Sequence, residues 1–428
     1  MIILILFISL FVALGIGIPV AYSIGISGVL TLFIFGEPNT FLVLGGRLFR
    51  GLESFPLMAV PFFILSGELM GVSITRKLID FASSLVGHIR GGLSQINTLA
   101  SLFFGGLTGA GVADTAALGS VLIPAMEKKG YKTSFAAAVT GATSTLGPIV
   151  PPSIPMVVYA LAVGGGVSIG ALFLSGIIPA ILITIAFMIL SYIIAIKDNH
   201  PIEGKFSFKK VLTTFKSAIL SLLMPIIILG GIISGFVTPT EAAAIAVFYA
   251  LIIGFFVYKD ITIKNLPIYF LNTAIVTSVV MLLIGIGRLL SWVLTINQIP
   301  IMLENLLHSF STSSIVFLLI IAFILFIVGL FMEGSAAIIM LAPVLAPISV
   351  TYGIDPIHFG FLMVMNLMLG MITPPVGVIL FVASGIANIS VEEILIEIWP
   401  YILVAYGVLL LVILFPEVTL FVPRLFGF

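Results

Sequence analysis

The sequence predicts an all-α polytopic membrane protein, and two observations carry this prediction. Apolar residues make up 61% of the chain and charged residues only 8%, whereas an average soluble domain carries roughly 25% charged residues. Stretches of about 20 apolar residues, long enough to cross a hydrocarbon core as a helix, recur from one end of the chain to the other. A soluble fold of this size could not cover its surface with so little charge, so we expect the chain to lie in a bilayer.

About ten apolar runs have the length of a membrane span. Two further apolar stretches, at about residues 91–127 and 314–350, are too long for one span, and glycines break each of them midway, in GGLTGAG and GLFMEG. We expect these stretches to form re-entrant helical hairpins. Scattered charge at residues 72–90 and 296–313 predicts helices that lie along the membrane surface. The ten expected spans are residues 2–18, 20–35, 54–71, 133–165, 167–195, 218–237, 239–258, 268–295, 356–386 and 398–416.

The chain contains an internal repeat. A shift of 223 residues brings the two hairpins into register and aligns LGPIVPP, which starts at Leu146, with LGMITPP, which starts at Leu369. Each half therefore contains one hairpin followed by one proline-broken helix. We predict a first repeat at residues 1–196 (hairpin about 91–127, broken helix about 133–165), a cytoplasmic linker at 197–217, and a second repeat at 218–428 (hairpin about 314–350, broken helix about 356–386).

The two repeats are expected to have inverted topology. Five spans and one hairpin in each half force the second copy to enter the membrane from the opposite side. Lys and Arg accumulate on the cytoplasmic face, and alternating the spans leaves only Arg47, Arg50 and Arg424 on the other face. We therefore expect both termini to be periplasmic, with the first hairpin entering from the cytoplasm and the second from the periplasm. The thirteen residues on the cytoplasmic face are Arg76, Lys77, Arg90, Lys128, Lys129, Lys132, Lys197, Lys205, Lys209, Lys210, Lys216, Lys259 and Lys264.

The broken helices are the expected sites of chemistry. In ATSTLGPIVPPS the prolines remove amide donors and leave carbonyl groups without partners. Such carbonyls can serve an ion near the membrane midplane, as in many secondary transporters, and oxygen ligands suit a small hard cation such as sodium. The structural alternative is that Ser and Thr hydroxyls only bond back to their own helix. Because two breaks occur in register, each beside a glycine-broken hairpin, we favour the functional interpretation.

The candidate ligands follow from this interpretation, and we expect neither an organic cofactor nor a metal other than sodium. The hairpin tips should close over the breaks, so that substrate sits between the tips. The candidate sodium ligands are Thr108, Gly109, Asp114, Thr143, Ser144, Gly147, Met332, Glu333, Asn366, Gly370 and Thr373. The candidate substrate residues are Ala110, Gly111, Pro151, Pro152, Ser153, Gly334, Ser335, Pro374 and Pro375.

Four ionisable residues in apolar segments have alternative roles. Asp114 could ligate a cation or cap its half-helix, and Glu333 could be a gate or ion-linked residue or, again, a cap. Glu241 follows Pro239 at a helix start, where we expect it to cap free amides. Arg288 could attract an anionic substrate, but we favour snorkelling or a structural ion pair.

Four segments in order resemble the large membrane subunit, DctM type, of the tripartite ATP-independent periplasmic (TRAP) transporters. They are GGLTGAGVADTAALGSVLIPAMEKKGY, GATSTLGPIVPPS, GFVTPTEAAA and NLMLGMITPPVGVILFVASGIA, and the resemblance runs over nearly the whole chain. It implies an elevator mechanism, sodium coupling, and a place in the bacterial inner membrane. It also implies a small four-span membrane subunit and a periplasmic substrate-binding protein as partners. The expected cargo is a small organic acid, of the sialic acid or C4-dicarboxylate class.

Two other functions compete with this one. A self-sufficient sodium:dicarboxylate symporter of similar hairpin design would need no binding protein. A polytopic lipid-modifying enzyme would need clustered acid, base or metal ligands, whereas the five aspartates and four histidines are scattered and the chain has no cysteine. We therefore expect no enzymatic activity and no nucleic-acid partner.

Overall fold

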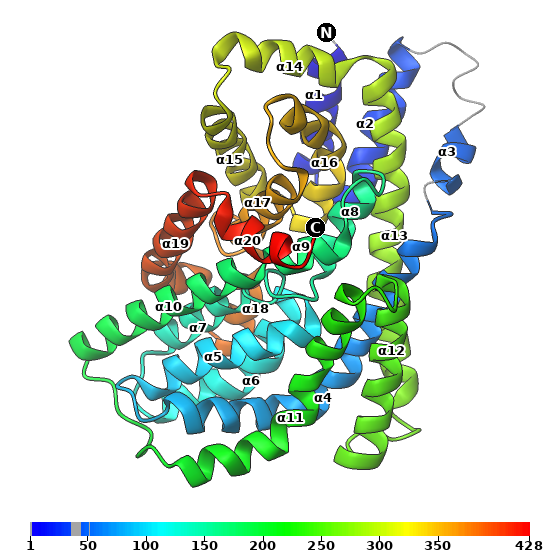
Figure 1. The fold of residues 1–428 in the computed structure, drawn as a ribbon. Helices are drawn as coiled ribbons and strands as arrows, with labels where there is room; N and C mark the ends of the chain where they lie inside the picture. Colours follow the sequence, from blue (N-terminus) through cyan, green and yellow to red (C-terminus); the bar gives the residue numbers. More distant parts are fainter. Residues whose placement is uncertain (1, 36–43, 51) are drawn as a thin grey trace.

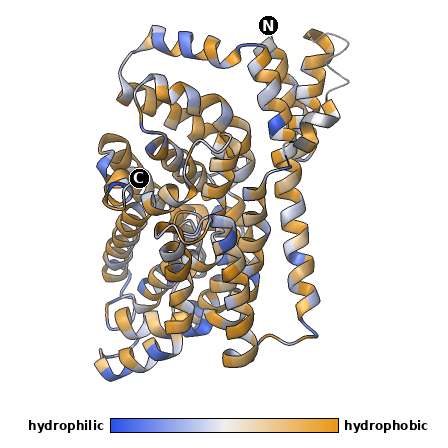
Figure 2. Ribbon diagram, turned by 45° about the vertical axis from the view of Figure 1, so that its right-hand side comes forward, coloured by the Kyte–Doolittle hydropathy of each residue, from blue (hydrophilic) through white to orange (hydrophobic). Residues whose placement is uncertain are grey.

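The protein is a bundle of helices, and the part of the chain that the structure describes contains no strand (Figure 1). The structure is a computed structural model that describes residues 2–35, 44–50 and 52–428. Hydrophobic residues dominate nearly every helix, as a body surrounded by lipid requires (Figure 2). The predicted fold class, an all-α polytopic membrane protein, is confirmed.

Seven helical segments of the described chain are long and apolar enough to cross a membrane, and a bent pair at residues 55–86 would be an eighth. Both arms of the second hairpin are among the seven, so this count does not determine the number of full spans. The seven are α9 with α10 (Ile169–Ser175 and Ile177–Lys197), α11 (Phe208–Ile233), α12 with the π-helical η3 (Pro239–Ile252 and Ile253–Tyr258), α13 (Leu266–Ile296), α15 (Ser314–Phe331), α16 (Gly334–Thr351) and α19 (Val391–Leu414). The chain starts with α1 (Ile2–Gly15), α2 (Val20–Phe35) and α3 (Leu44–Arg50), and ends with α20 (Glu417–Leu425).

Both predicted hairpins and both predicted helix breaks are present. In the first hairpin, α5 (Gly92–Thr108) and α6 (Gly111–Lys128) meet at residues 109–110, the first tip. In the second, α15 and α16 meet at residues 332–333, the second tip. The first break, residues 145–153, separates α7 (Thr133–Ser144) from α8 (Ile154–Ala162), and the second break, residues 371–377, separates α17 (Pro356–Gly370) from α18 (Val378–Ala387).

The helix ends follow the repeat that the sequence predicts. Helices α6 and α16 start and end 223 residues apart, and so do the starts of α7 and α17. In Figure 1 the α5–α6 hairpin lies in the lower half of the molecule and α15–α16 in the upper half, as an inverted pair requires. The membrane face of each hairpin and of each terminus stays a prediction, and the side chains of Arg47 and Arg50, used for it, lie outside the described residues.

The linker between the halves is shorter than the predicted residues 197–217. Helix α10 ends at Lys197 and α11 already begins at Phe208. The lysines at the start of α11 suggested a loop, but Val211, Thr214 and Ala218 are at least half-buried and recur at helical spacing. The charged residues therefore lie on the exposed side of an amphipathic helix.

The two predicted interfacial helices differ in the structure. Residues 72–90 do not form a separate helix, because α4 (Ala59–Val86), preceded by η2 (Phe55–Met58), continues through them and bends by 69° between Gly71 and Ile74. Residues 296–313 contain the separate helix α14 (Ile299–Phe310), which lies across the top of the molecule in Figure 1. The half of α4 after its bend is the counterpart of α14 in the repeat.

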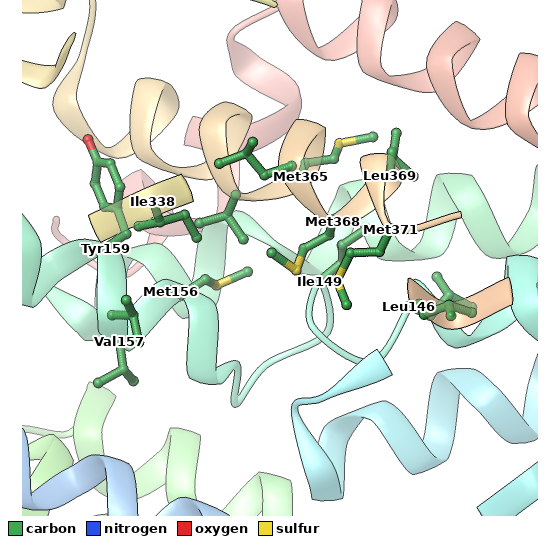
Figure 3. Packing of buried hydrophobic residues seen from close by; sticks show 14 of the residues in the cluster. Leu146, Ile149, Met156, Val157, Tyr159, Ile338, Met365, Met368, Leu369 and Met371 are labelled. Carbon is green, nitrogen blue, oxygen red and sulfur yellow. The ribbon is translucent and has the colours of Figure 1, made fainter. Parts of the chain in front are cut away.

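The core lies where the two broken helices meet. Side chains from both broken helices, almost all apolar, form one buried cluster in which four methionines fill the space between them (Figure 3). These methionines therefore pack the helices against each other. The labelled members include Leu146, Ile149, Met156, Met365, Met368, Leu369 and Met371.

Candidate functional site

The first tip lies against the first break, backbone to backbone. A Cβ added at Gly109 would come within 2.7 Å of the Pro152 carbonyl oxygen, and one added at Gly111 within 3.0 Å of the Ser144 carbonyl oxygen. Gly109 also has a positive φ of 63°, which glycine adopts without strain. Glycine at these positions therefore lets the tip approach the carbonyl groups of the break closely.

Asp114 points into this contact from the first turn of α6. Its side chain is 0% exposed. Thr108 donates a hydrogen bond to Oδ1, whereas Oδ2 has no hydrogen-bond partner in the described structure. A Cβ added at Gly147 would overlap this free oxygen. A buried carboxylate needs a partner for its charge, so a cation or a proton is expected at Oδ2.

The capping alternative for Asp114 is wrong. Helix α6 starts after Ala110, and no side chain caps its first turn. Among the described contacts, the carboxylate accepts a hydrogen bond from a hydroxyl group and from no backbone amide. The position of Asp114, one turn inside the helix, directs its carboxylate toward the first break instead of toward the helix start.

The hydroxyl groups beside the first break turn away from the tip. Ser144 donates to the carbonyl oxygen of Thr140 at 2.7 Å, and the Thr143 hydroxyl lies 3.2 Å from the same oxygen and 3.1 Å from Asn97 Oδ1. This is the back-bonding that the structural alternative predicted. The backbone carbonyls of Ser144 and Pro152 face the tip, so any cation bound here would meet carbonyl groups and Asp114 rather than these hydroxyls.

Helix caps account for two further predicted residues. Glu333 precedes α16 and accepts a hydrogen bond from the amide of Ala336 at 3.0 Å, which confirms the capping interpretation of this residue. Ser153, a predicted substrate residue, likewise caps α8 by accepting from the amide of Met156 at 3.3 Å. A helix cap explains both side chains without a ligand.

The second hairpin and the second broken helix also pack closely, near the tip and the break. A Cβ added at Gly370 would come within 2.7 Å of the Gly329 Cα atom, so backbone meets backbone here as well. Asn366 is fully buried, donates to the Ala322 carbonyl oxygen at 2.8 Å, and leaves its Oδ1 atom without a partner among the described residues. Thr373 donates back to its own helix. Among the described residues each site therefore offers one free side-chain oxygen, which belongs to a carboxylate in the first and to a neutral carboxamide in the second.

The structure brings both predicted sets of residues into one region. Helix α6 of the first hairpin packs against α18 of the second broken helix, and α16 of the second hairpin packs against α8 of the first. The predicted residues at the first tip and break are Thr108, Gly109, Ala110, Gly111, Asp114, Thr143, Ser144, Gly147, Pro151, Pro152 and Ser153. Those at the second are Met332, Glu333, Gly334, Ser335, Asn366, Gly370, Thr373, Pro374 and Pro375.

Three further ionisable or polar residues, Glu241, Arg288 and Asn97, lie outside the two tips and breaks. Glu241 forms the expected capping box with Thr238. The Nη2 atom of Arg288 donates to the Leu161 carbonyl oxygen at 2.6 Å, and Arg288 has no ion pair with a described residue, so of the two favoured roles only snorkelling stays a prediction. Asn97 was not nominated, although it is a carboxamide in an otherwise largely apolar hairpin arm. No three His, Asp or Glu side chains gather as a metal site within the described ranges.

Comparison with known proteins decides the family. Residues 7–418 match the sequence profile of the tripartite ATP-independent periplasmic transporter, DctM component. The chain belongs to the DctM family. This DctM chain is 39% identical to the sialic acid TRAP transporter large permease SiaM of Vibrio cholerae, over 96% of this chain and 96% of that protein. It is 40% identical to the C4-dicarboxylate TRAP transporter large permease DctM of Pseudomonas aeruginosa, over 95% of this chain and 94% of that protein.

The fold is also similar to the crystal structure of the YdaH transporter of Alcanivorax borkumensis, with a TM-score of 0.62 over 89% of this chain and 88% of that chain. At 14% sequence identity this likeness concerns the fold alone. The DctM chain is thus a multi-pass membrane permease, and the predicted resemblance to the TRAP family is confirmed. The family is a component of tripartite transporters, and the two relatives are named as large permeases for organic acids.

Proposed function

We propose that this DctM chain uses a sodium gradient to import a small organic acid across the bacterial inner membrane. One observation supports the sodium step above all others. Among the described residues the buried Asp114 carboxylate keeps one oxygen without a partner, against Gly147, at a contact that includes the backbone carbonyls of Ser144 and Pro152. A sodium ion there could bind to carboxylate and carbonyl oxygens, and its charge would offset that of the carboxylate.

A proton at Asp114 is the competing explanation for the free oxygen. A proton would neutralise the carboxylate but would make no use of the Pro152 carbonyl oxygen, which faces the glycine tip, or of the second lone pair of the Ser144 carbonyl oxygen, which already accepts from the Gly147 amide at 3.1 Å. A hard cation uses both features, because carboxylate and carbonyl oxygens are the ligands that such cations take in proteins. We therefore favour sodium.

An organic anion as cargo is supported by the relatives and by two helix starts. SiaM is named for sialic acid and the Pseudomonas DctM for C4-dicarboxylates, and both cargos are carboxylic acids. Helices α6 and α18 pack against each other, and neither has a side-chain cap at its N-terminus. Uncapped helix starts attract anions. The proposed substrate region lies between the tips, beside Ala110, Gly111, Gly334 and Ser335.

The proposed motion is an elevator, in which the two hairpins and two broken helices move as one body against the other spans. The packing of α6 on α18 and of α16 on α8 supports a common moving body, because each hairpin contacts the broken helix of the other half. As partners we propose a small membrane subunit of about four spans and a periplasmic substrate-binding protein. The alternative, a self-sufficient symporter, would need neither.

Uptake into proteoliposomes tests this function. The chain is reconstituted with its small subunit and binding protein, and uptake of a panel of radiolabelled organic acids is measured with inward sodium or choline gradients. We expect uptake only with sodium and binding protein, and loss of uptake in Asp114→Asn but not in Asp80→Asn, which removes an exposed carboxylate of α4. Full uptake by the chain alone would favour the self-sufficient symporter, and uptake unaffected by sodium would contradict sodium coupling.

A further inference from the structure

We infer that Asn97 is a positioning residue for the first break, and that it acts through a network of buried hydrogen bonds with Ser101, Thr140 and Thr143. The inference rests on the proposed function, because the position that this network determines is that of the proposed sodium ligands. Asn97 itself does not contact the ion region. It holds the end of α7 in the place where the Ser144 carbonyl faces the first tip.

The contacts of this network join the first hairpin to the first broken helix. The Asn97 Nδ2 atom donates to the Thr140 hydroxyl at 2.7 Å, and the Thr143 hydroxyl donates to Asn97 Oδ1 at 3.1 Å. Ser101 donates to the Thr143 hydroxyl at 3.0 Å. All four side chains are 0% exposed. Asn97 and Ser101 belong to α5, whereas Thr140 and Thr143 belong to the last turns of α7, so the network ties the two helices together.

The network ends one residue from a proposed ligand. Thr143 precedes Ser144, the last residue of α7, whose hydroxyl donates to the Thr140 carbonyl oxygen at 2.7 Å. The Ser144 carbonyl then faces Gly111 of the hairpin. Partners of this kind, one step behind the ligands, orient ligands at metal sites, and replacing them typically lowers metal affinity by 10- to 100-fold.

The second repeat shows that the fold does not require this network. At the shift of 223, Asn97 corresponds to Ile320, Ser101 to Ile324 and Thr140 to Met363, all of them apolar. Only the Thr143 counterpart, Asn366, is polar, and it bonds to the backbone of α15. The second hairpin nevertheless packs on its broken helix. Helix packing alone therefore does not explain the buried polar groups of the first repeat.

The hydrogen-bond network and the buried Asp114 carboxylate occur in the same repeat. Asp114 corresponds to Ala337, so the first repeat alone carries both a buried carboxylate at this position and the Asn97 network. If backbone carbonyl oxygens and the Asp114 carboxylate bind one ion together, the distance between them must stay constant. A rigid network on the adjoining helix end provides this constraint.

Sodium-dependent thermal stability of the purified complex in nanodiscs tests the inference without knowledge of the substrate. Sodium chloride replaces choline chloride at constant ionic strength, and the sodium concentration that gives the half-maximal rise in melting temperature is measured. We expect Asn97→Leu and Thr143→Val to raise this concentration by at least about tenfold, and Thr143→Ser, which keeps the hydroxyl, to restore it.

Gln95→Leu is the matched control. Gln95 is a buried carboxamide on the same helix, but it donates to the Met188 carbonyl oxygen of α10 at 2.9 Å and not to α7. We expect Gln95→Leu to lower the melting temperature without changing the sodium concentration of half-maximal effect. Hydrogen–deuterium exchange without sodium should become faster at residues 144–153 in Asn97→Leu and Thr143→Val, but not in Gln95→Leu.

An unchanged half-maximal sodium concentration in folded Asn97→Leu and Thr143→Val would overturn the inference, and so would unchanged exchange at the first break. If Asn97→Leu does not fold, the Thr143→Val and Thr143→Ser pair decides the question alone. A wild-type complex that sodium does not stabilise at all would instead overturn the proposed function, an outcome that the wild-type titration reveals before any variant is made.

Discussion

Arg288 of α13 donates a hydrogen bond from Nη2 to the carbonyl oxygen of Leu161, 2.6 Å away, in the last turn of α8. Arg288 also lines a small cavity, together with Ala162, Ile284 and Ile339, among others. A cation at a helix C-terminus meets the negative end of the helix dipole. Since α8 belongs to the proposed moving body and α13 to the proposed scaffold, this bond joins the two parts in the arrangement that the structure shows.

We therefore predict that Arg288→Met shifts the chain away from this arrangement. A hydrogen bond to a charged donor contributes about 1.5–3 kcal/mol, which corresponds to a shift in population of roughly tenfold or more. The measurement is the yield of a disulfide between cysteines introduced at Ala162 and Ile284, in a chain that has no cysteine of its own. The yield should fall in Arg288→Met. An equal yield with and without Arg288 would show that the bond does not hold the two parts together.

Gly147→Ala is predicted to disable the proposed sodium site. The added methyl group would overlap Oδ2 of Asp114 and would push the carboxylate off the first break. Overpacking of this kind costs about 1–3 kcal/mol of stability, and we expect sodium affinity to fall by at least about tenfold. Sodium-dependent melting temperatures give both values. Gly407→Ala is the control, because a Cβ there meets nothing within 4 Å, and a similar effect of both substitutions would count against a site at Gly147.

Two substitutions at Glu333 distinguish its role as a helix cap from a role of its negative charge. Glu333→Gln keeps an oxygen that can accept from the Ala336 amide, whereas Glu333→Ala removes it. Loss of a helix cap costs about 0.5–2 kcal/mol, so the alanine variant alone should show a lower melting temperature. If Glu333 only caps α16, sodium dependence should be the same in Glu333→Gln as in the wild type. A weaker sodium response in the glutamine variant would instead support Glu333 as a sodium ligand.

The linker at residues 198–207 is predicted to loosen in acid. His200 is buried there, with its ring centroid 4.2 Å from that of Tyr131 and 5.0 Å from that of Phe135. Burial lowers the pKa of His200 below its usual value near 6.5, although Asp198 and Glu397 oppose this shift and Lys132 adds to it. The folded chain thus disfavours the protonated ring, and the unfolded chain binds the proton more readily.

The sign of the pH effect follows from this shift. The contribution of His200 to stability is complete above a pH of about 6.5 and is lost as the pH falls through the lowered pKa. Hydrogen–deuterium exchange of residues 198–207 should therefore become faster between pH 7.5 and pH 5.5, relative to the intrinsic rate. His200→Phe, which keeps the stacked ring, should remove this difference. Exchange with the same pH dependence in both proteins would refute a role for His200.

The helix breaks and the repeat could be read from the sequence because they depend on local covalent chemistry. A proline lacks an amide donor wherever it occurs, and a glycine tolerates a positive φ in any surroundings. Gly109 and the prolines of the two breaks therefore mark the hairpin tip and the helix ends without reference to the rest of the chain. The register of 223 residues follows from such marks, and α6 and α16 obey it at both ends.

Helix ends that lack such a mark were less predictable. Charge and polarity predicted a separate helix from residue 72 and a linker up to residue 217, whereas α4 bends after Gly71 and α11 starts at Phe208. A charged residue can lie on the exposed side of a helix as easily as in a loop. Polarity by itself therefore does not separate these cases, and helical spacing of the half-buried residues decides between them.

The sequence by itself determined that this chain is a duplicated membrane protein with two hairpins and two broken helices, because Gly, Pro and apolar length act locally. Only the tertiary structure decided which oxygens face the tip. The hydroxyls of Thr143 and Ser144 form hydrogen bonds away from the tip. Asn97 donates a hydrogen bond to Thr140, 43 residues away in the sequence, and Arg288 donates one to Leu161, 127 residues away. In an apolar bundle a polar side chain takes its partner from whichever helix packs beside it, and that neighbour is determined by the fold as a whole.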